Sequence, residues 1–527
     1  MPRKRLPIGI QTFREIREGG YYYVDKTGFA LRLIEKGKYY FLSRPRRFGK
    51  SLFLDTLAEL FSGNEPLFAG LAAQDRWRWD WGRRYPVIRL SFAEGVLRSR
   101  DELDRRIADL LRLNREALGV ETYLDLDIPG LFGELIRKTR NHYGERVVVL
   151  VDEYDKPILD NLTQPDRAWE MRDGLRNLYS AIKGADADLR FAFLTGVSTF
   201  SKVSLFSGLN NLNDITLDER YSAICGYTEA DLDAIFAPEL ADLDRDQIRT
   251  WYHGYHWTGE SVYNPFDLLL LFQKRRFRPW WFETATPTFL VDLLTERQTF
   301  IPRLEHLITS ERLLSAFDVD HIATEALLFQ TGYLTIATVR QLGTFVQYQL
   351  RYPNLEVRAS LTGALLDQLS ADSPAVAERT TRLYELLLAN DFAGLPALFT
   401  AFFASIPGDG FRNNPIARFE GYYANVFYAY FASLGLDLTP EASSNAGRLD
   451  LALRFNDQIY LFEFKVVELE PEGRALQQIK DWGYADPHRA AGLPIHLIGV
   501  EFSREQRRVV EFEVETLEPQ AKKLKRK

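Results

Sequence analysis

Two carboxylates and one ammonium group near the end of the chain have a spacing suited to metal-dependent chemistry. Asn456-Asp457 lies between two apolar runs and is typical of a two-residue β-hairpin turn. Counting outward from this turn pairs Asp450 with Glu463, and strand alternation puts Glu463 and Lys465 on one face. Carboxylates about 5 Å apart repel each other unless a divalent cation lies between them or one is protonated. The pattern predicts a site for Mg²⁺, with Mn²⁺ as an alternative, where Lys465 orients water or stabilises charge developing on a phosphodiester.

An alternative interpretation is a solvated strand face, on which Glu463 and Lys465 form an ordinary ion pair. Apolar residues, however, occupy both faces of both strands, in residues 449–453 and 461–464. Two apolar faces are typical of a strand in the middle of a sheet, where unpaired charge is costly. Burial therefore favours the metal site.

This arrangement resembles the PD-(D/E)xK nuclease superfamily. The superfamily's first acid falls on Asp450, and its E-x-K element falls on Glu463 and Lys465. The resemblance implies a catalytic site for phosphodiester cleavage built from these three residues.

The same resemblance implies support from the helices on either side of the hairpin. Glu420 opens an apolar stretch that runs to Leu434, and it is the candidate for a third metal ligand. Gln478 and Tyr484 belong to the stretch that resembles the following helix, from which they would support the site.

A phosphate-binding loop is predicted near the other end of the chain. Residues 38–43 read as a buried strand, residues 44–51 as a loop, and an apolar helix follows from about Leu52. Gly49 suits the turn, Lys50 the β and γ phosphate oxygens, and Ser51 the Mg²⁺ ion. Arg44 stands where the generic pattern has glycine. The residues assigned to nucleotide binding in this loop are Arg46, Arg47, Phe48, Gly49, Lys50, Ser51 and Leu52.

A second motif follows in the order that an ATP site requires. Residues 146–151 form a continuous apolar run that ends in Asp152 and Glu153, typical of a buried parallel strand. Asp152 is the candidate that joins Ser51 at the Mg²⁺ ion, and Glu153 the candidate that polarises the attacking water.

A third apolar run, residues 190–194, ends at Thr195. Thr195 is the candidate that senses the γ-phosphate, and Ser198 is a second candidate for this role. The alternative is an ordinary α/β domain whose strands happen to end in acids. Two motifs in the expected order favour an ATP site.

Several further stretches together resemble a bacterial and archaeal family, the AAA-ATPase-like proteins with a C-terminal PD-(D/E)xK nuclease domain. The family's own phosphate loop reads R-P-R-R-F-G-K-S, which Arg44 matches. The resemblance implies ATP binding or hydrolysis and nucleic-acid cleavage. The stretches that carry it include residues 6–10, 22–27, 41–51, 152–157, 195–203, 207–212, 251–255 and 282–287.

Length and composition limit the number of domains and the kind of protein that the chain can form. A chain of 527 residues is expected to form two to four domains. The start of the chain lacks a signal peptide, no apolar run of about 18 residues occurs, and Cys225 is the single cysteine. We therefore expect a cytoplasmic protein without membrane spans or disulfides. Because the chain has a net charge of −7, any surface that binds nucleic acid must be a local basic patch.

The expected fold class is α/β, with several domains. Alternating strands and helices predict a three-layer α/β ATPase, with strands at 38–43, 86–92, 147–152 and 190–195 and an amphipathic helix at 99–118. Two wing-like strands, at 332–336 and 352–357, and a breaker-rich linker at 406–415 are also expected. The predicted regions are an AAA-ATPase-like P-loop domain at 1–225, a helical lid at 226–300, a helical or winged-helix-like region at 301–405 and an α/β nuclease-like domain at 406–527.

The leading functional prediction is an ATP-binding and ATP-hydrolysing protein with an Mg²⁺-dependent nuclease domain, active in defence or DNA handling. Its expected partners are ATP, nucleic acid, with DNA favoured, and further copies of itself. One alternative is a nucleotide switch whose C-terminal domain binds nucleic acid or protein without cleaving it. Another is an active nuclease whose nucleotide site binds ATP without hydrolysing it.

Overall fold

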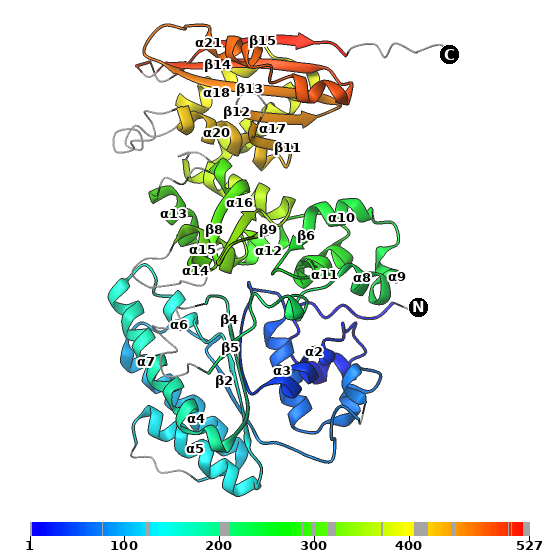
Figure 1. The fold of residues 1–527 in the computed structure, drawn as a ribbon, viewed down its shortest axis with the longest axis vertical. Helices are drawn as coiled ribbons and strands as arrows, with labels where there is room; N and C mark the ends of the chain where they lie inside the picture. The colour runs from blue at the N-terminus through cyan, green and yellow to red at the C-terminus, as the bar shows by residue number, and fades with distance from the viewer. Residues whose placement is uncertain are drawn as a thin grey trace. The chain divides into compact units, whose positions relative to one another are not determined.

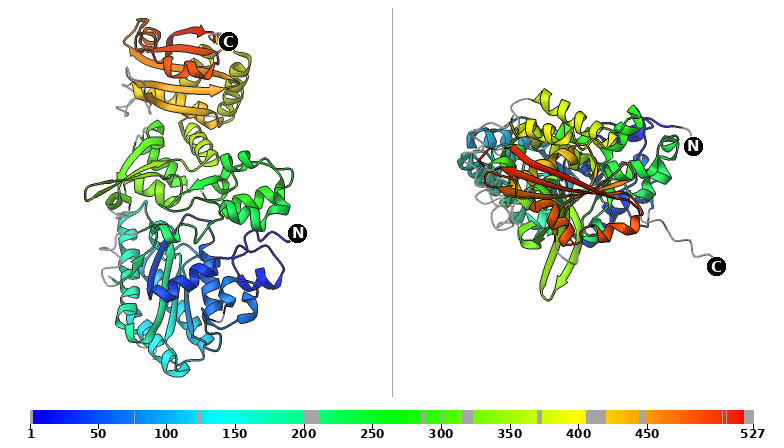
Figure 2. Two further views of the ribbon diagram at one scale, coloured as in Figure 1. Left: turned by 45° about the vertical axis from the view of Figure 1, so that its right-hand side comes forward. Right: turned by 90° about the horizontal axis from the view of Figure 1, so that it is seen from above.

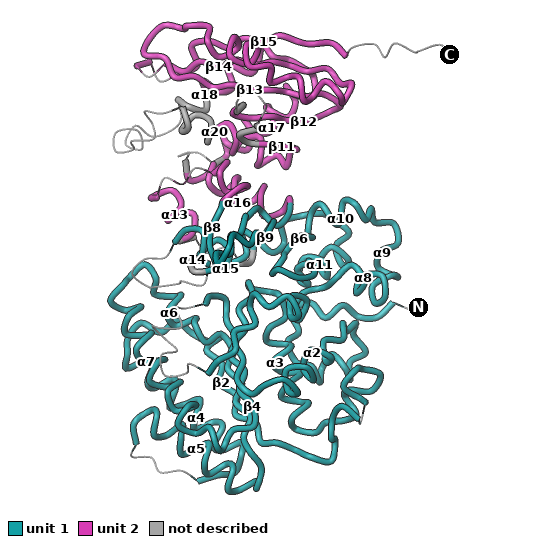
Figure 3. Tube along the Cα trace, viewed as in Figure 1, with its two compact units in different colours: residues 1–285, 308–354 teal, residues 286–307, 355–527 magenta. Residues whose placement is uncertain are grey.

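The computed structural model describes residues 3–519, except 76, 122–125, 200–210, 286–287, 298, 300, 315–322, 370–372, 405–419, 444–447, 504 and 507. Its contacts define two compact units (Figure 3). Unit 1 comprises residues 1–285 and 308–354, and unit 2 comprises residues 286–307 and 355–527. The predicted linker at 406–415 lies outside the described residues, and the predicted four-region division stays a prediction.

A parallel five-stranded sheet forms the centre of unit 1, in the order β2-β3-β4-β1-β5. The four strands predicted at 38–43, 86–92, 147–152 and 190–195 are confirmed, and β5 is an additional short edge strand. Residues of β1 and β3 are buried throughout, as expected for strands covered on both faces. The strands are β1 (Tyr39–Ser43), β2 (Val87–Ser91), β3 (Val147–Asp152), β4 (Leu189–Gly196) and β5 (Asn213–Asp214).

Helices flank this sheet on both sides. In Figure 1, α3 lies on one side and α4, α5 and α7 lie on the other. The helix predicted at 99–118 is confirmed as α4, and Ser99 caps it by accepting a hydrogen bond from the Glu102 N–H. The helices of this layer system are α1 (Phe13–Glu18), α2 (Thr27–Lys36), α3 (Lys50–Phe61), α4 (Arg100–Leu118), α5 (Ile128–Tyr143), α6 (Lys156–Leu159) and α7 (Pro165–Gly184).

Short helices dominate the next part of unit 1. They pack around Leu232, Phe236 and Tyr252 together with Tyr22 from the start of the chain. Their predicted role as a lid stays a prediction. The elements are α8 (Glu229–Ile235), α9 (Ala237–Leu240), α10 (Arg245–Tyr252), β6 (His253–Tyr255), β7 (Val262–Tyr263), α11 (Pro265–Lys274) and α12 (Trp280–Ala285).

A three-stranded sheet in the order β8-β10-β9 completes unit 1. The sequence prediction placed the second wing-like strand at 352–357, and this was wrong. The partner of β9 is β10, because Gly343-Thr344 forms the turn, with Gly343 at φ 63°. Leu355 instead begins a helix of unit 2. The elements are β8 (Leu307–Ser310), α14 (Glu311–Leu314), α15 (Thr324–Thr331), β9 (Thr335–Leu342) and β10 (Phe345–Arg351).

Unit 2 contains a mixed sheet in the order β11-β12-β13-β14-β15, in which β13 and β14 are parallel and the other pairs antiparallel. The predicted hairpin is β12–β13. Asn456 and Asp457 both have positive φ, as a type I′ turn requires, and Phe455 pairs with Gln458 as predicted. The strands are β11 (Asp437–Ser443), β12 (Arg448–Phe455), β13 (Gln458–Val467), β14 (Ile495–Ser503) and β15 (Arg508–Leu517).

Helices cover both faces of the central strand β13. Phe462 and Phe464 pack against Phe431 and Phe427 of α20 on one face. Since alternate residues face opposite ways, Glu463 points to the other face, where α21 lies. No helix of the described residues has the length and apolarity to cross a membrane. The helices of unit 2 are α13 (Thr288–Glu296), α16 (Leu355–Leu369), α17 (Ser373–Ala389), α18 (Leu395–Ala404), α20 (Glu420–Ser433) and α21 (Arg474–Asp481).

Candidate nucleotide and metal sites

The predicted phosphate loop connects the end of β1 to the start of α3. Two of its residues, Arg47 and Gly49, have positive φ values of 68° and 91°. The buried Lys50 ammonium donates hydrogen bonds to the carbonyls of Arg44, at 2.9 Å, and Pro45, at 3.0 Å. Burial lowers the pKa of Lys50, and the Asp152 carboxylate opposes this shift. Lys50 is thus positioned by the loop's own backbone.

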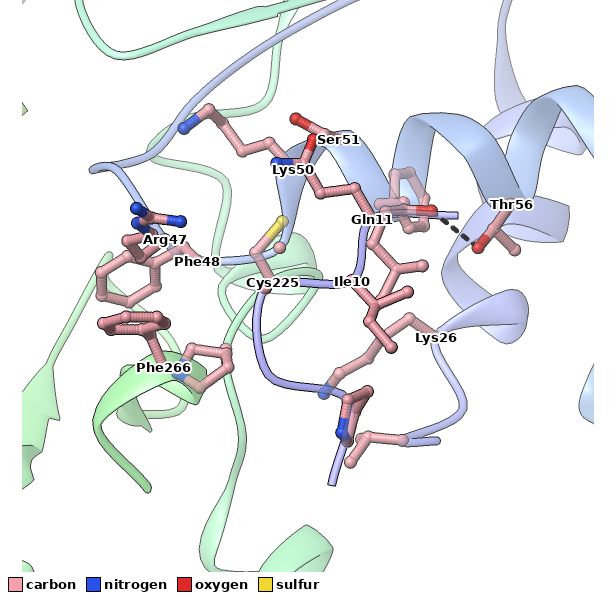
Figure 4. Close-up of a pocket in the computed structure, with 18 of the residues that line it drawn as sticks. Ile10, Gln11, Lys26, Arg47, Phe48, Lys50, Ser51, Thr56, Cys225 and Phe266 are labelled. Carbon is pink, nitrogen blue, oxygen red and sulfur yellow. Dashed lines mark hydrogen bonds between the residues drawn. The ribbon is translucent and has the colours of Figure 1, made fainter. Parts of the chain in front are cut away.

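A cavity of about 440 Å³ opens at this loop (Figure 4). One part of its wall is polar and includes Lys50, Ser51 and Glu153, which the sequence predicted. The other part is largely apolar and was not predicted as a site. Its residues come from the start of the chain and from the helices after β5: Pro7, Gly9, Ile10, Gln11, Tyr23, Val24, Ile224, Phe266 and Leu269.

The predicted acids lie at the end of β3, next to the loop. Asp152 is 8% exposed, and its Oδ1 accepts a hydrogen bond from the Glu153 N–H at 3.0 Å. Glu153 has a φ of 49°, an uncommon value for a residue with a side chain, which turns it toward the cavity that it lines. Burial raises the pKa of Glu153, and Lys50 opposes that shift. Asp152 itself does not line the cavity.

Thr195 and Ser198 lie away from the cavity wall. Thr195 is fully buried and donates its hydroxyl hydrogen to the Leu42 carbonyl at 2.9 Å. Ser198 donates to the Asp155 carboxylate, which also accepts from the Val197 N–H. The Thr195 hydroxyl thus bonds to β1 and the Ser198 hydroxyl to Asp155, so the structure does not bring either of them to Lys50.

The arginines of the loop differ in their surroundings. Arg44 is fully buried, donates to the Thr216 carbonyl at 3.0 Å and lies 4.1 Å from the centre of the Trp257 ring. Burial lowers the pKa of Arg44 to about 10. The Arg44 side chain supports the loop from the protein interior. It occupies the position at which the generic phosphate-loop pattern has glycine.

The remaining predicted loop residues line the cavity. Arg46 and Arg47 are exposed, and the Arg47 guanidinium lies 4.8 Å from the centre of the Phe266 ring. Phe48 is buried, with its ring edge-on to that of Tyr255, and Leu52 is half-buried.

The β12–β13 hairpin brings the second predicted set together. Glu463 is 2% exposed, and its Oε1 lies 3.4 Å from the Lys465 Nζ and accepts a hydrogen bond from the Gln478 amide. Its Oε2 is buried without a hydrogen-bond partner. Asp450 accepts a hydrogen bond from the Phe464 N–H at 2.9 Å. Burial and then the Asp450 charge raise the pKa of Glu463 to about 8.

A buried carboxylate oxygen without a partner, next to a second carboxylate, fits a divalent cation that binds oxygen ligands. Among the described residues, no group of three or more His, Cys, Asp or Glu side chains is arranged to hold a metal ion. Glu420 is the first residue of α20, but its side chain lies outside what the structure describes. Its role as a third ligand therefore stays a prediction.

A glycine that was not predicted as functional allows α21 to pack closely on β14, next to the β12–β13 hairpin. Gly499 lies opposite Glu463 in β14, and a Cβ atom there would lie 2.3 Å from the Leu476 backbone nitrogen. This close approach places Gln478 against Glu463. Tyr484 is buried just beyond the helix, where burial raises its pKa and Gln478 hydrogen-bonds to it. The sequence feature that could have indicated this contact is a glycine inside the largely apolar stretch 495–503.

Comparisons with known proteins agree with this arrangement. Residues 7–206 match a family model described as predicted AAA-ATPase, and residues 418–512 match a model of the PD-(D/E)XK nuclease superfamily. A protein of Azotobacter chroococcum mcd 1, described as "Uncharacterized protein in vnfD 5'region", is 67% identical over 518 residues, covering 98% of this chain and 100% of that protein. No solved structure matches the chain. The chain belongs to the AAA-ATPase-like family whose members carry a C-terminal PD-(D/E)XK nuclease superfamily domain.

Proposed function

We propose that the chain binds and hydrolyses ATP at the loop of unit 1 and cleaves phosphodiester bonds of nucleic acid at the β12–β13 hairpin of unit 2. DNA as the substrate, assembly into homo-oligomers and a role in defence or DNA handling are parts of this proposal. The observation that carries the nuclease half is the buried, unpartnered Oε2 of Glu463 beside Asp450.

In the proposed nucleotide site, different side chains would bind phosphate, bind Mg²⁺ and activate water. Lys50 is buried with its ammonium on two carbonyls, which phosphate oxygens would replace as acceptors. Ser51 and Asp152 would hold Mg²⁺, and Glu153, whose pKa is raised by burial, would take the proton from attacking water. Tyr23, Phe266 and the other apolar wall residues suit the flat face of a base.

In the nuclease site, Asp450 and Glu463 would hold the metal ion, which supplies activation of water and charge neutralisation at the phosphate when bound. Lys465 lies beside Glu463 and would donate to the negative charge that develops on the phosphate. Gln478 fixes the orientation of the Glu463 carboxylate through its amide. These roles require Glu463 to be ionised, which its raised pKa opposes until a cation binds.

The raised pKa of Glu463 also supports a second candidate function. A protonated Glu463 would remove the repulsion from Asp450 without any metal ion. In that case the C-terminal domain would bind nucleic acid or protein without cleaving it, and ATP would act as a switch.

The test is cleavage of labelled double-stranded DNA, single-stranded DNA and RNA with Mg²⁺ or Mn²⁺, with and without ATP. Asp450→Ala is compared with Glu470→Ala, which removes an exposed carboxylate just after β13. Cleavage that needs metal, persists in Glu470→Ala and disappears in Asp450→Ala supports the nuclease. Absence of cleavage under all conditions, or cleavage unaffected by Asp450→Ala, favours the switch.

A further inference from the structure

The β9–β10 ribbon, residues Thr335–Arg351, projects from its neighbours in unit 1 (Figure 2). Its base is fixed. The Thr335 hydroxyl accepts a hydrogen bond from the His256 N–H at 2.7 Å, and the His256 Nδ1 lies 3.0 Å from the Ile336 carbonyl oxygen. Near this base, Gly332 packs on the phosphate loop, where an added Cβ would lie 2.8 Å from Pro45. The ribbon therefore extends from a rigid support.

The tip of the ribbon exposes apolar side chains. Leu342 and Phe345 pair across the strands next to the turn and are 53% and 50% exposed, and Val339 is 45% exposed. The Leu342–Phe345 pair forms an exposed apolar surface at the projecting tip that a partner can cover, whereas Val339 lies farther from the turn and on the other face.

One face of the ribbon also carries polar groups. Below the Leu342–Phe345 pair, Arg340 pairs with Gln347 and Thr338 pairs with Gln349. Alternate residues along each strand share a face, so these pairs and the apolar pair lie on the same side. The face presents the Arg340 guanidinium and the Gln347 amide below the apolar tip, and nearer the base the Thr338 hydroxyl donates to the Gln349 side-chain oxygen at 3.2 Å.

The charge of the ribbon differs from that of the whole chain. Residues 335–351 contain Arg340 and Arg351 and no acidic residue, whereas the chain has a net charge of −7. Both arginines are exposed. Arg340 lies near the tip and Arg351 at the base, opposite Thr335, so the ribbon carries positive charge at both ends, which is complementary to a polyanion.

We propose that the β9–β10 ribbon enters the major groove of double-stranded DNA, with Arg340 and the two glutamines at base edges or phosphates and the Leu342–Phe345 tip against the bases. A two-stranded ribbon fits this groove, arginine and glutamine match guanine and adenine edges, and apolar groups contact thymine methyl groups. The proposal rests on the proposed function only in that both take nucleic acid as the partner.

Binding is measured by fluorescence anisotropy of a labelled duplex of about two helical turns in EDTA, so that no cleavage occurs. Arg340→Gln should weaken binding about tenfold and lower the slope of log Kd against log salt by about one. The double variant Leu342→Ser/Phe345→Ser should also weaken it, by about threefold or more. Matched controls on α4, Arg105→Gln and Leu113→Ser, change exposed residues of the same types and should bind as wild type.

Groove placement is tested by competition. Methyl green, which occupies the major groove, should displace the protein, and netropsin, which occupies the minor groove, should not. Displacement by netropsin alone would overturn the proposal. So would ribbon variants that bind duplex within twofold of wild type, or that lose duplex and single-stranded binding equally.

Two further readouts separate this proposal from others. If the ribbon variants alter the sedimentation coefficient without DNA and leave Kd unchanged, the tip contacts another copy and the DNA proposal is wrong. Asp450→Ala should bind duplex normally in EDTA, so a failed cleavage assay and a failed ribbon are distinguishable.

Discussion

The cavity at the phosphate loop and the β12–β13 hairpin differ in how their buried charged groups are paired. Lys50 is buried, yet its ammonium donates to two backbone carbonyls. Glu463 is buried as deeply, yet one of its oxygens accepts nothing and its pKa is raised to about 8. The Lys50 ammonium is paired by the loop's own backbone, whereas Glu463, with Lys465 beside its Oε1, leaves Oε2 open to a proton or a divalent cation. The contrast indicates where binding of an ion should change the protein most.

The largest expected effect is on cleavage. Lys465→Met keeps both carboxylates but removes the ammonium beside Glu463. We expect the rate of cleavage to fall by about 10² to 10³, because a preorganised positive charge beside the reacting phosphate is lost. Initial rates on labelled duplex measure this. Lys480→Met, a lysine on α21 that pairs with Glu515 instead, should cleave normally; equal losses in both variants would contradict the role of Lys465.

Lys50→Met tests the proposed ATP site at the phosphate loop. This variant loses the ammonium at the phosphate loop and the bonds to two carbonyls. ATP affinity should fall by about a hundredfold, measured with a fluorescent ATP analogue, because a charged contact to phosphate is worth about 3 kcal/mol. Lys36→Met on the exposed end of α2 is the control. Unchanged affinity in Lys50→Met would place the nucleotide elsewhere.

Gly499→Ala tests whether α21 must lie directly on the sheet. The added methyl group would meet the Leu476 backbone at 2.3 Å, so α21 and Gln478 should move away from Glu463. We expect roughly tenfold slower cleavage and a loss of about 1 to 3 kcal/mol in the free energy of unfolding. Gly363→Ala on α16, where the nearest atom lies at 4.0 Å, should leave both values unchanged or raise stability. Normal cleavage in Gly499→Ala would show that Gln478 does not position Glu463.

A gradual effect, spread over several pH units, is expected on the pH dependence of stability without metal. Glu463 has a folded pKa of about 8 against about 4.3 when unfolded, so the folded state binds more protons between these values. Stability from this group is therefore complete below about pH 4.3 and is lost as pH rises toward 8, by at most about 1.4 kcal/mol per pH unit. Chemical unfolding in EDTA should show this slope, and Glu463→Gln should reduce it. An identical slope in both proteins would remove Glu463 as its source.

Local patterns predicted much of the fold. Apolar runs identified three parallel strands and the alternation of strands with helices a fourth, and Asn456-Asp457 set the register of the β12–β13 hairpin, because turn chemistry and strand alternation act over short distances. The wing strand was misplaced because the Gly343-Thr344 turn was overlooked.

The candidate sites were predicted less completely. The apolar wall from Pro7 to Gln11 meets the phosphate loop about 40 residues later, a tertiary contact that no local pattern indicates. Thr195 was expected at the pocket because it ends a strand. The end of a strand does not set the direction of a side chain, however, and that of Thr195 hydrogen-bonds to β1.

The most direct test of the account is Mn²⁺ titration by calorimetry without ATP, at pH 7 and pH 9, in buffers with different ionisation enthalpies. We expect the β12–β13 hairpin to bind Mn²⁺ and to release about one proton at pH 7, because Glu463 must ionise, and almost none at pH 9. Asp450→Ala should abolish this binding, and Glu470→Ala should not. Binding that is the same in wild type and Asp450→Ala, or no binding at either pH, would contradict a cation site between Asp450 and Glu463.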